Sequence, residues 1–134
     1  TPHKNAMPLG GLPDLTPEML GENPATLTQP ELDFEKFDYA PYDPKSTEEL
    51  LEFLDKNVNE AIETLRNTPD DVFLENWTMR NGETVYFTMP KISVMRSFVG
   101  NHIVHHRGQL SVYMRLNDIA VPSIYGPSAD EGQM

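Results

Sequence analysis

Residues 91–117, which read KISVMRSFVGNHIVHHRGQLSVYMRLN, predict one long helix. Pro90 suits a first helical turn, and a stripe of mostly apolar and histidine side chains then recurs every three or four residues. The members of this stripe are Ile92, Met95, Val99, His102, His106, Gln109 and Tyr113. At 1.5 Å per residue the helix would be roughly 40 Å long, which is typical of helical bundles. The segment therefore favours an all-α fold.

A second amphipathic helix is predicted over residues 46–67. Ser46 and Glu49 have the spacing of a capping box, in which each side chain satisfies a free backbone amide. The apolar positions that follow are Leu50, Leu54, Val58, Ala61, Ile62 and Leu65. A short helix is expected over 69–75, and a small hairpin near 77–89.

The two ends of the chain are predicted to be irregular. Of the 12 prolines, most fall in residues 1–45, so this segment is expected to form at most a turn or two of helix, opened by Pro17 and stopped by Gly21. Residues 118–134 are expected to form an extended tail. With 134 residues, the chain 1–134 is expected to be a single domain.

The composition limits the function classes. The formal net charge of −11 argues against nucleic acid as a partner, since phosphate backbones are bound by basic surfaces. No apolar run reaches the roughly 18 residues of a membrane-spanning helix. The chain has no cysteine, which excludes disulfides and thiolate metal sites and is compatible with the cytosol. We therefore expect a soluble, cytoplasmic protein that binds neither nucleic acid nor membrane.

The charge is unevenly distributed. Residues 1–76 carry a balance of −12, and residues 77–134 a balance of +1. Within 91–117 there are four basic residues and no acidic one. Anionic ligands, if any, are therefore expected on this helix.

Three histidines in the same helix suggest a metal site. His102 and His106 are about 40° apart on a helical wheel, whereas His105 lies about 60° to the other side of His102. Two imidazoles one turn apart can chelate zinc, nickel or iron, but such a pair can equally be structural and hydrogen-bonded in the core. Ile103 stands where zinc proteases carry a catalytic glutamate, which excludes that mechanism. Gln109 could orient a ligand, touch substrate or satisfy a buried carbonyl.

The C-terminal half resembles the DinB family. The resemblance rests on HHRGQLSVYMRL at 105–116 and PSIYGPSADE at 122–131, and extends upstream through PHKNAMPLG at 2–10, ELDF at 31–34 and the predicted helix. It implies an up-down four-helix bundle, commonly dimeric, with a divalent metal held by three histidines. Relatives look like metal-dependent hydrolases or thiol-dependent transferases. If the chain begins at Thr1, the bundle lacks the family's first helix, and the resulting apolar groove is expected to be filled by a partner helix or by a homodimer.

The resemblance also implies a set of site residues. His102 and His106 would be two ligands of zinc or nickel, and His105, Gln109 and Tyr113 would surround them, orienting the ligands or touching substrate.

The family's third ligand position is occupied by Leu15, which cannot bind a metal. His3 is the remaining imidazole, and Asp14 or Glu18 could supply an oxygen instead.

Two functions follow from these expectations. In the first, the metal site serves hydrolysis or thiol-dependent transfer of a small-molecule substrate, with no catalytic residue assigned. In the second, Leu15 closes the old site, and the chain is a metal-free structural or binding dimer. The tail residues Tyr125, Asp130 and Glu131 either rim a pocket or seal the end of the bundle.

Overall fold

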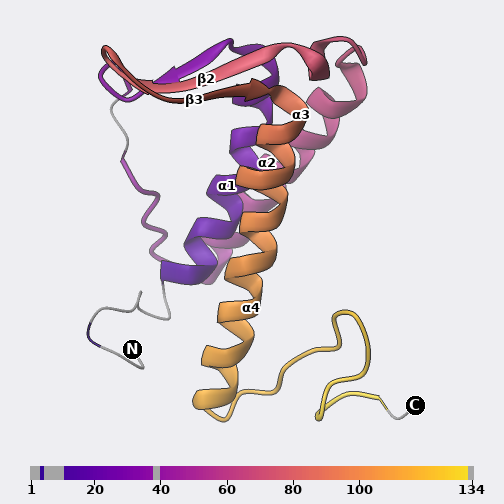
Figure 1. Cartoon of the computed structure of the whole chain (residues 1–134). Coiled ribbons are helices and arrows are strands. Elements are labelled where there is room, and N and C mark those ends of the chain that lie inside the picture. Colours follow the sequence, from indigo (N-terminus) through magenta and orange to yellow (C-terminus); the bar gives the residue numbers. More distant parts are fainter. Residues whose placement is uncertain (1–3, 5–10, 38–39, 133–134) are drawn as a thin grey trace.

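The structure is a computed structural model that describes Lys4 and residues 11–37 and 40–132, without the side chains of Leu12, Asp14, Leu15 and Asn23. Three long helices carry a small sheet across one end (Figure 1). The helices are α1 (Gly11–Thr28), α2 (Thr47–Asn67) and α4 (Asn101–Leu116). No helix in these ranges is long and apolar enough to cross a membrane.

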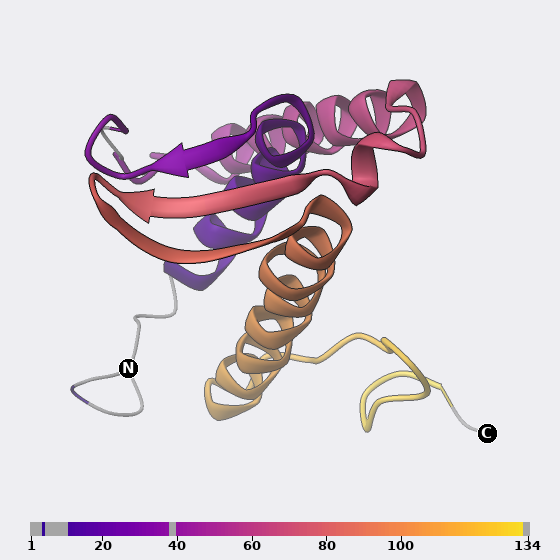
Figure 2. The same cartoon turned by 45° about the horizontal axis from the view of Figure 1, so that its top comes forward.

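The three-stranded sheet overturns the prediction of an all-α four-helix bundle. Its strands β1 (Glu31–Asp33), β2 (Asn76–Asn81) and β3 (Thr84–Pro90) lie in the order β1-β2-β3. The predicted hairpin is confirmed as the antiparallel pair β2 and β3, whereas β1 adds to β2 in parallel (Figure 2). The three residues of β1 belong to a stretch that was expected to be irregular, because they carry no strand pattern without their distant partner.

Asp33 joins β1 to the hairpin. Its buried carboxylate accepts hydrogen bonds from the amides of Gly82, at 2.9 Å, and Glu35, at 3.2 Å, and lies 3.1 Å from Lys36 Nζ. These bonds, that from Gly82 first, lower the pKa of Asp33. Gly82 has a φ of +55°, and a Cβ at this position would lie 2.9 Å from a carboxylate oxygen of Glu35. The turn therefore requires glycine.

Helix α1 corrects the prediction of an irregular first third and of a turn ending at Gly21. Pro17 and Pro24 lie inside the helix, although an interior proline costs about 3 kcal/mol. Pro17 is fully buried, and its carbonyl accepts a hydrogen bond from Asn57 Nδ2 of α2 at 2.9 Å. Packing against α2 therefore stabilises a helix that the local sequence disfavours.

Helix α2 follows its prediction closely. The Ser46 hydroxyl accepts from the Glu49 amide at 3.2 Å, and the Glu49 carboxylate in turn accepts from the Lys45 amide at 2.7 Å. The helix ends at Asn67, and the short helix expected near 69–75 is the 3₁₀ turn η1 (Val72–Leu74). Strong local signals at both ends explain the agreement.

The predicted long helix is confirmed, but it contains a π-helical segment. It consists of α3 (Lys91–Val94), the π segment η2 (Met95–Gly100) and α4. Its buried apolar, histidine and tyrosine positions are Val94, Val99, His106 and Tyr113. Val94 and Val99 are five residues apart, because the π turn between them holds more residues than an α turn. Val99, His106 and Tyr113 of the expected stripe are buried, whereas His102 and Gln109, which were also expected in it, are exposed.

The long helices form one layer with α1 in the middle. Helix α1 packs against α2 on one side and α4 on the other, whereas α2 and α4 hardly touch (Figure 2). Glu18 and Leu20 of α1 are two residues apart and project to opposite faces of this layer. We call the face of Glu18 the histidine face and the face of Leu20 the groove face.

The histidine face is crossed by the segment that leads into α2. Glu18 accepts a hydrogen bond from the amide of Tyr42, whose ring stacks on Phe53 of α2 at 4.0 Å between centroids. Ile103 lines the same depression as Leu20, and helical spacing puts His105 on the other side of α4 from Ile103. The exposed histidines and the depression at Leu20 therefore lie on either side of α4, and Asn101 lines both this depression and the one beside the histidines.

Candidate functional site

The first turns of α4 bring three histidine rings together. The ring centroids of His102 and His106 are 4.6 Å apart, those of His105 and His106 are 5.0 Å apart, and those of His102 and His105 are 6.5 Å apart. His106 is buried against the layer, while His102 and His105 are exposed. The predicted pair therefore lies at the edge between core and solvent.

The hydrogen bonds of this pair define which ring nitrogen is free. His102 Nδ1 lies 3.2 Å from the carbonyl of Phe98, and His106 Nδ1 lies 2.8 Å from Oε1 of Gln109. Both neighbours are acceptors, so each neutral ring carries its hydrogen on Nδ1 and keeps a lone pair on Nε2. Histidines that bind metals are commonly held in this way by an acceptor on the other nitrogen.

His102 is also held in the neutral form. Its pKa is lowered, first by partial burial and then by the neighbouring His106 and His105, against a smaller opposing effect of the Phe98 carbonyl. Only a neutral imidazole can donate a lone pair to a metal. The lowered pKa of His102 therefore favours its neutral form at neutral pH.

The described residues bring two imidazoles together at the predicted site and add no third donor beside them. Among the side chains that the structure describes, no three histidine, aspartate or glutamate residues could hold a metal ion together. Glu18 is bonded to the amide of Tyr42, and His3 and the side chain of Asp14 lie outside the described part of the chain. The donor set fits a chelate of two imidazoles with open coordination positions, and it does not fit a site of three histidines.

The other two predicted site residues, Gln109 and Tyr113, do not share one environment. Gln109 contacts His106 directly, as the spacing suggested for an orienting residue. Tyr113 is buried two turns further along the core stripe. A Cβ at Gly108 would meet nothing within 4 Å, so packing against another helix does not explain this glycine.

A shallow depression beside the histidines was not predicted. It encloses about 340 Å³. Its lining consists of Ser97, Phe98, Asn101, His102 and His105. Phe98 also stacks on Phe87 of β3 at 4.7 Å between centroids, which ties the histidine segment to the sheet. A possible sequence signal is spacing, since Phe98 stands one turn before His102.

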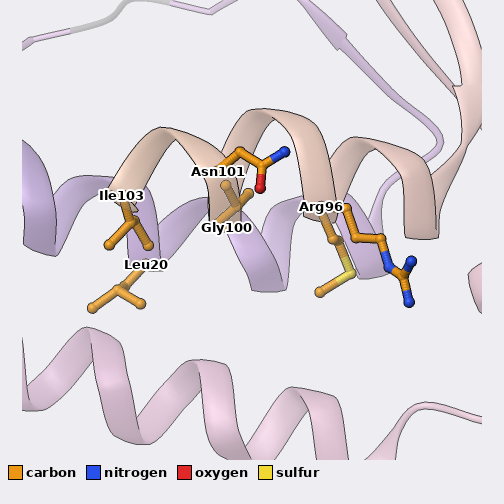
Figure 3. Close-up of a pocket in the computed structure, with 7 residues that line it drawn as sticks. Leu20, Arg96, Gly100, Asn101 and Ile103 are labelled. Atoms are coloured by element: carbon orange, nitrogen blue, oxygen red, sulfur yellow. The ribbon is translucent and has the colours of Figure 1, made fainter. Parts of the chain in front are cut away.

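A larger depression of about 610 Å³ lies on the groove face. It is lined by Leu20, Met95, Arg96, Val99, Gly100, Asn101 and Ile103. Figure 3 shows Leu20 and Ile103 projecting into the same space from two helices, with Arg96 at one end and Asn101 turned away. The arrangement is an open apolar groove with a basic end.

The tail is fastened to α4 by polar contacts. Arg115 binds the carboxylate of Asp130 with both terminal nitrogens, at 3.0 and 2.5 Å, and Arg107 donates to the hydroxyl of Tyr125 at 2.6 Å. Glu131 accepts from the amide of Ser123 at 2.8 Å. All three candidate rim residues therefore have contacts that hold the tail together.

Fold and site together define a class of small α+β protein in which a long last helix carries three clustered histidines. The model of the DinB family matches residues 17–133, so the chain belongs to the DinB family. One curated relative, the uncharacterized protein YrdA of Bacillus subtilis (strain 168), is 46% identical over 43 residues, which are 32% of this chain and 25% of YrdA. The aligned segment thus spans about a quarter of that relative. No solved structure matches the chain.

Proposed function

We propose that the chain binds one divalent transition-metal ion, zinc or nickel, through Nε2 of His102 and His106. The observation that supports this proposal is the pair of Nδ1 contacts, to the Phe98 carbonyl and to Gln109, which leave both Nε2 lone pairs free. With only two protein ligands, several coordination positions remain for water or a small molecule.

The reaction class follows from the ion and the protein groups beside it. A bound divalent ion supplies a Lewis acid that polarises a carbonyl or activates water, as hydrolysis and thiol-dependent transfer require. The depression at Phe98 and Asn101 gives a small-molecule substrate a place next to the ligands. His105 lines this depression and stands 5.0 Å from the His106 ring, so its imidazole is placed to accept or return a proton.

A metal-free binding or structural protein is the second candidate. It is favoured by the lack of a third donor among the described side chains and by Leu15 at the family's third ligand position. In that case the histidine pair would serve packing alone.

Elemental analysis of protein purified without a histidine tag separates the two candidates. We expect about one zinc or nickel ion per chain after soaking and desalting, and none in a variant carrying both His102→Ala and His106→Ala. A content far below one ion per chain in the unmodified protein would remove the metal proposal and leave the second candidate.

A further inference from the structure

The depression beside His102 and His105 holds the open end of a row of aromatic rings. Phe98 lines this depression and is 36% exposed. Its ring stacks on Phe87 of β3 with the two planes 20° apart, and the Phe87 ring lies 6.1 Å from the ring of the buried Trp77. Stacked and tilted aromatic pairs of this kind attract one another beyond the area that they bury. The row therefore ends at Phe98 with ring surface that a flat ligand can cover.

The depression also offers neutral hydrogen-bonding groups. Ser97 supplies a hydroxyl and Asn101 a carboxamide. The Asn101 side chain is turned away from the groove that Leu20 lines (Figure 3). A hydroxyl and a carboxamide both donate and accept hydrogen bonds, so they can pair with a carbonyl or with another amide. The polar contacts on offer are those that an uncharged carbonyl compound needs.

None of the described residues that line this depression carries a permanent charge. The long helix has four basic residues, but each of them has other surroundings. Lys91 is buried with its Nζ 2.9 Å from the carboxylate of Glu75, Arg96 lines the groove, and Arg107 and Arg115 bind the tail. An anion in the depression would find no lysine or arginine among these lining residues, and the net charge of −11 would repel it.

The size of the depression limits the ligand to a small molecule. Its volume of about 340 Å³ is at the lower end of the roughly 300–1,000 Å³ that ligand pockets enclose. A single ring with one polar group is a ligand of suitable size.

We propose that the depression binds an uncharged aromatic carbonyl compound, a benzamide or a benzoate ester, with its ring on Phe98 and its carbonyl at Ser97 and Asn101. The claim that this ligand is the substrate rests on the proposed function, because His102, one of the two proposed metal ligands, lines the same depression. The binding of the ring itself does not require the metal.

Titration of benzamide into the full chain without metal is the first test. We expect saturable shifts of the backbone amide signals of Ser97, Phe98 and Asn101 in nitrogen-15 spectra. The dissociation constant should be on the order of millimolar for a ligand of this size. Saturable shifts elsewhere in the chain alone, or no binding up to the solubility limit of benzamide, overturn the proposal.

Two further compounds test the chemical class. Cyclohexanecarboxamide carries the same amide on a puckered ring and should bind roughly fivefold more weakly, because it cannot stack on Phe98. Benzoate has nearly the shape of benzamide but carries a negative charge, and it should also bind more weakly. Equal binding of cyclohexanecarboxamide would overturn the stacking, and equal or tighter binding of benzoate would overturn the uncharged class.

Substitutions test the position of the ring. Phe98→Leu should abolish the preference for benzamide over cyclohexanecarboxamide, whereas Phe34→Leu, a matched change at a 42% exposed position after β1, should keep it. Because Phe98 packs on Phe87, thermal melting checks that the variant is folded. Ser97→Trp, at an exposed position, fills the depression with both phenylalanines in place and should block benzamide. A preference that survives in Phe98→Leu, or benzamide binding that survives in Ser97→Trp, overturns the proposal.

A pair of hydroxamates separates this proposal from that of the metal site. Acetohydroxamate and benzohydroxamate chelate zinc through the same oxygens and differ in a methyl and a phenyl group. In calorimetric titrations of the zinc-loaded chain, we expect both to bind, benzohydroxamate about tenfold more tightly. Binding of neither, with benzamide binding intact, would remove the metal site and leave the aromatic site. Equal binding of both would show that the aromatic site does not serve the metal, which overturns the claim about the substrate.

Discussion

The charged cluster at Asp33 and the histidine cluster on α4 differ in how many of their hydrogen-bonding atoms are paired within the chain. The Asp33 carboxylate is buried and accepts two backbone amides, with Lys36 beside it. In His102 and in His106, Nδ1 is hydrogen-bonded to an acceptor, and Nε2 keeps its lone pair. A polar group whose bonding capacity is used within the chain fixes the fold, whereas one with capacity left over at the surface can bind something else.

The sharpest way to test this difference is to remove a predicted ligand. His102→Ala and His106→Ala should each weaken nickel or zinc binding about 100-fold, because one imidazole alone no longer chelates. Calorimetric titration of the full chain measures the loss, and thermal melting should show little change for the exposed His102.

The matched control for these variants is His105→Ala, which should bind metal like the unmodified protein. Equal losses in all three variants would contradict the assignment of His102 and His106 as the ligands.

At the sheet, a substitution is expected to lower the stability of the fold and to leave metal affinity unchanged. Gly82→Ala should destabilise the fold by about 1–2 kcal/mol, because alanine disfavours the positive φ of this turn and its Cβ would crowd Glu35. Urea unfolding gives the change, and metal affinity should stay the same. Gly126→Ala, where a Cβ would meet nothing within 4 Å, is the control. A loss of metal affinity in Gly82→Ala would show that the two regions are coupled.

A smaller effect is expected for the residue that holds His106. Gln109→Leu removes the acceptor at Nδ1 and should weaken metal binding about tenfold. Nitrogen-15 spectra of the metal-free protein should show that the His106 hydrogen no longer favours Nδ1. Gln109→Glu keeps an acceptor oxygen and should preserve the tautomer. An unchanged tautomer in Gln109→Leu would mean that Gln109 does not position the ring.

The smallest effect concerns Glu22 of α1. Burial, and then the negative charge of Glu18, raise its pKa from 4.5 to about 7. The folded chain therefore holds this proton more tightly than the unfolded chain, so the contribution to stability is full below pH 4.5 and is lost as the pH rises to about 7.

Glu22→Gln should flatten this part of the pH dependence of unfolding. Although its carboxyl group is partly desolvated, the Glu22 residue is largely exposed to solvent. The change in the free energy of unfolding should therefore stay under about 1 kcal/mol. Glu60→Gln, at an exposed position of α2, is the control. A stability that falls between pH 5 and 7 by the same amount in the unmodified protein and in Glu22→Gln would contradict the role of this carboxyl.

Local signals explain which parts of the fold could be predicted. The capping box at Ser46 and the turn at Gly82 act within a few residues, and both elements were predicted correctly. Helix α1 and strand β1 depend on distant partners, Asn57 for Pro17 and Gly82 for Asp33. The first third and the fold class were therefore predicted wrongly.

The candidate site was predictable in composition but not in orientation. The spacing of His102 and His106 predicted that the two rings lie close together, and orienting a ligand was one of three roles expected for Gln109. The π segment before them carries no recognisable side-chain pattern, and the exposure of His102 and Gln109 was not predicted. The hydrogen bond between His102 and the Phe98 carbonyl was also not predicted, because every residue type has the same backbone carbonyl.

The long-range bonds of α1 and β1 have a consequence for how the chain folds during synthesis. The partners of Pro17, Asp33 and Leu27 lie 40, 49 and 64 residues later in the chain. A ribosome therefore releases α1, with its interior prolines, well before anything can stabilise it. We expect the N-terminal third to stay unfolded until α2 and the hairpin have emerged, and to be the part most dependent on chaperones.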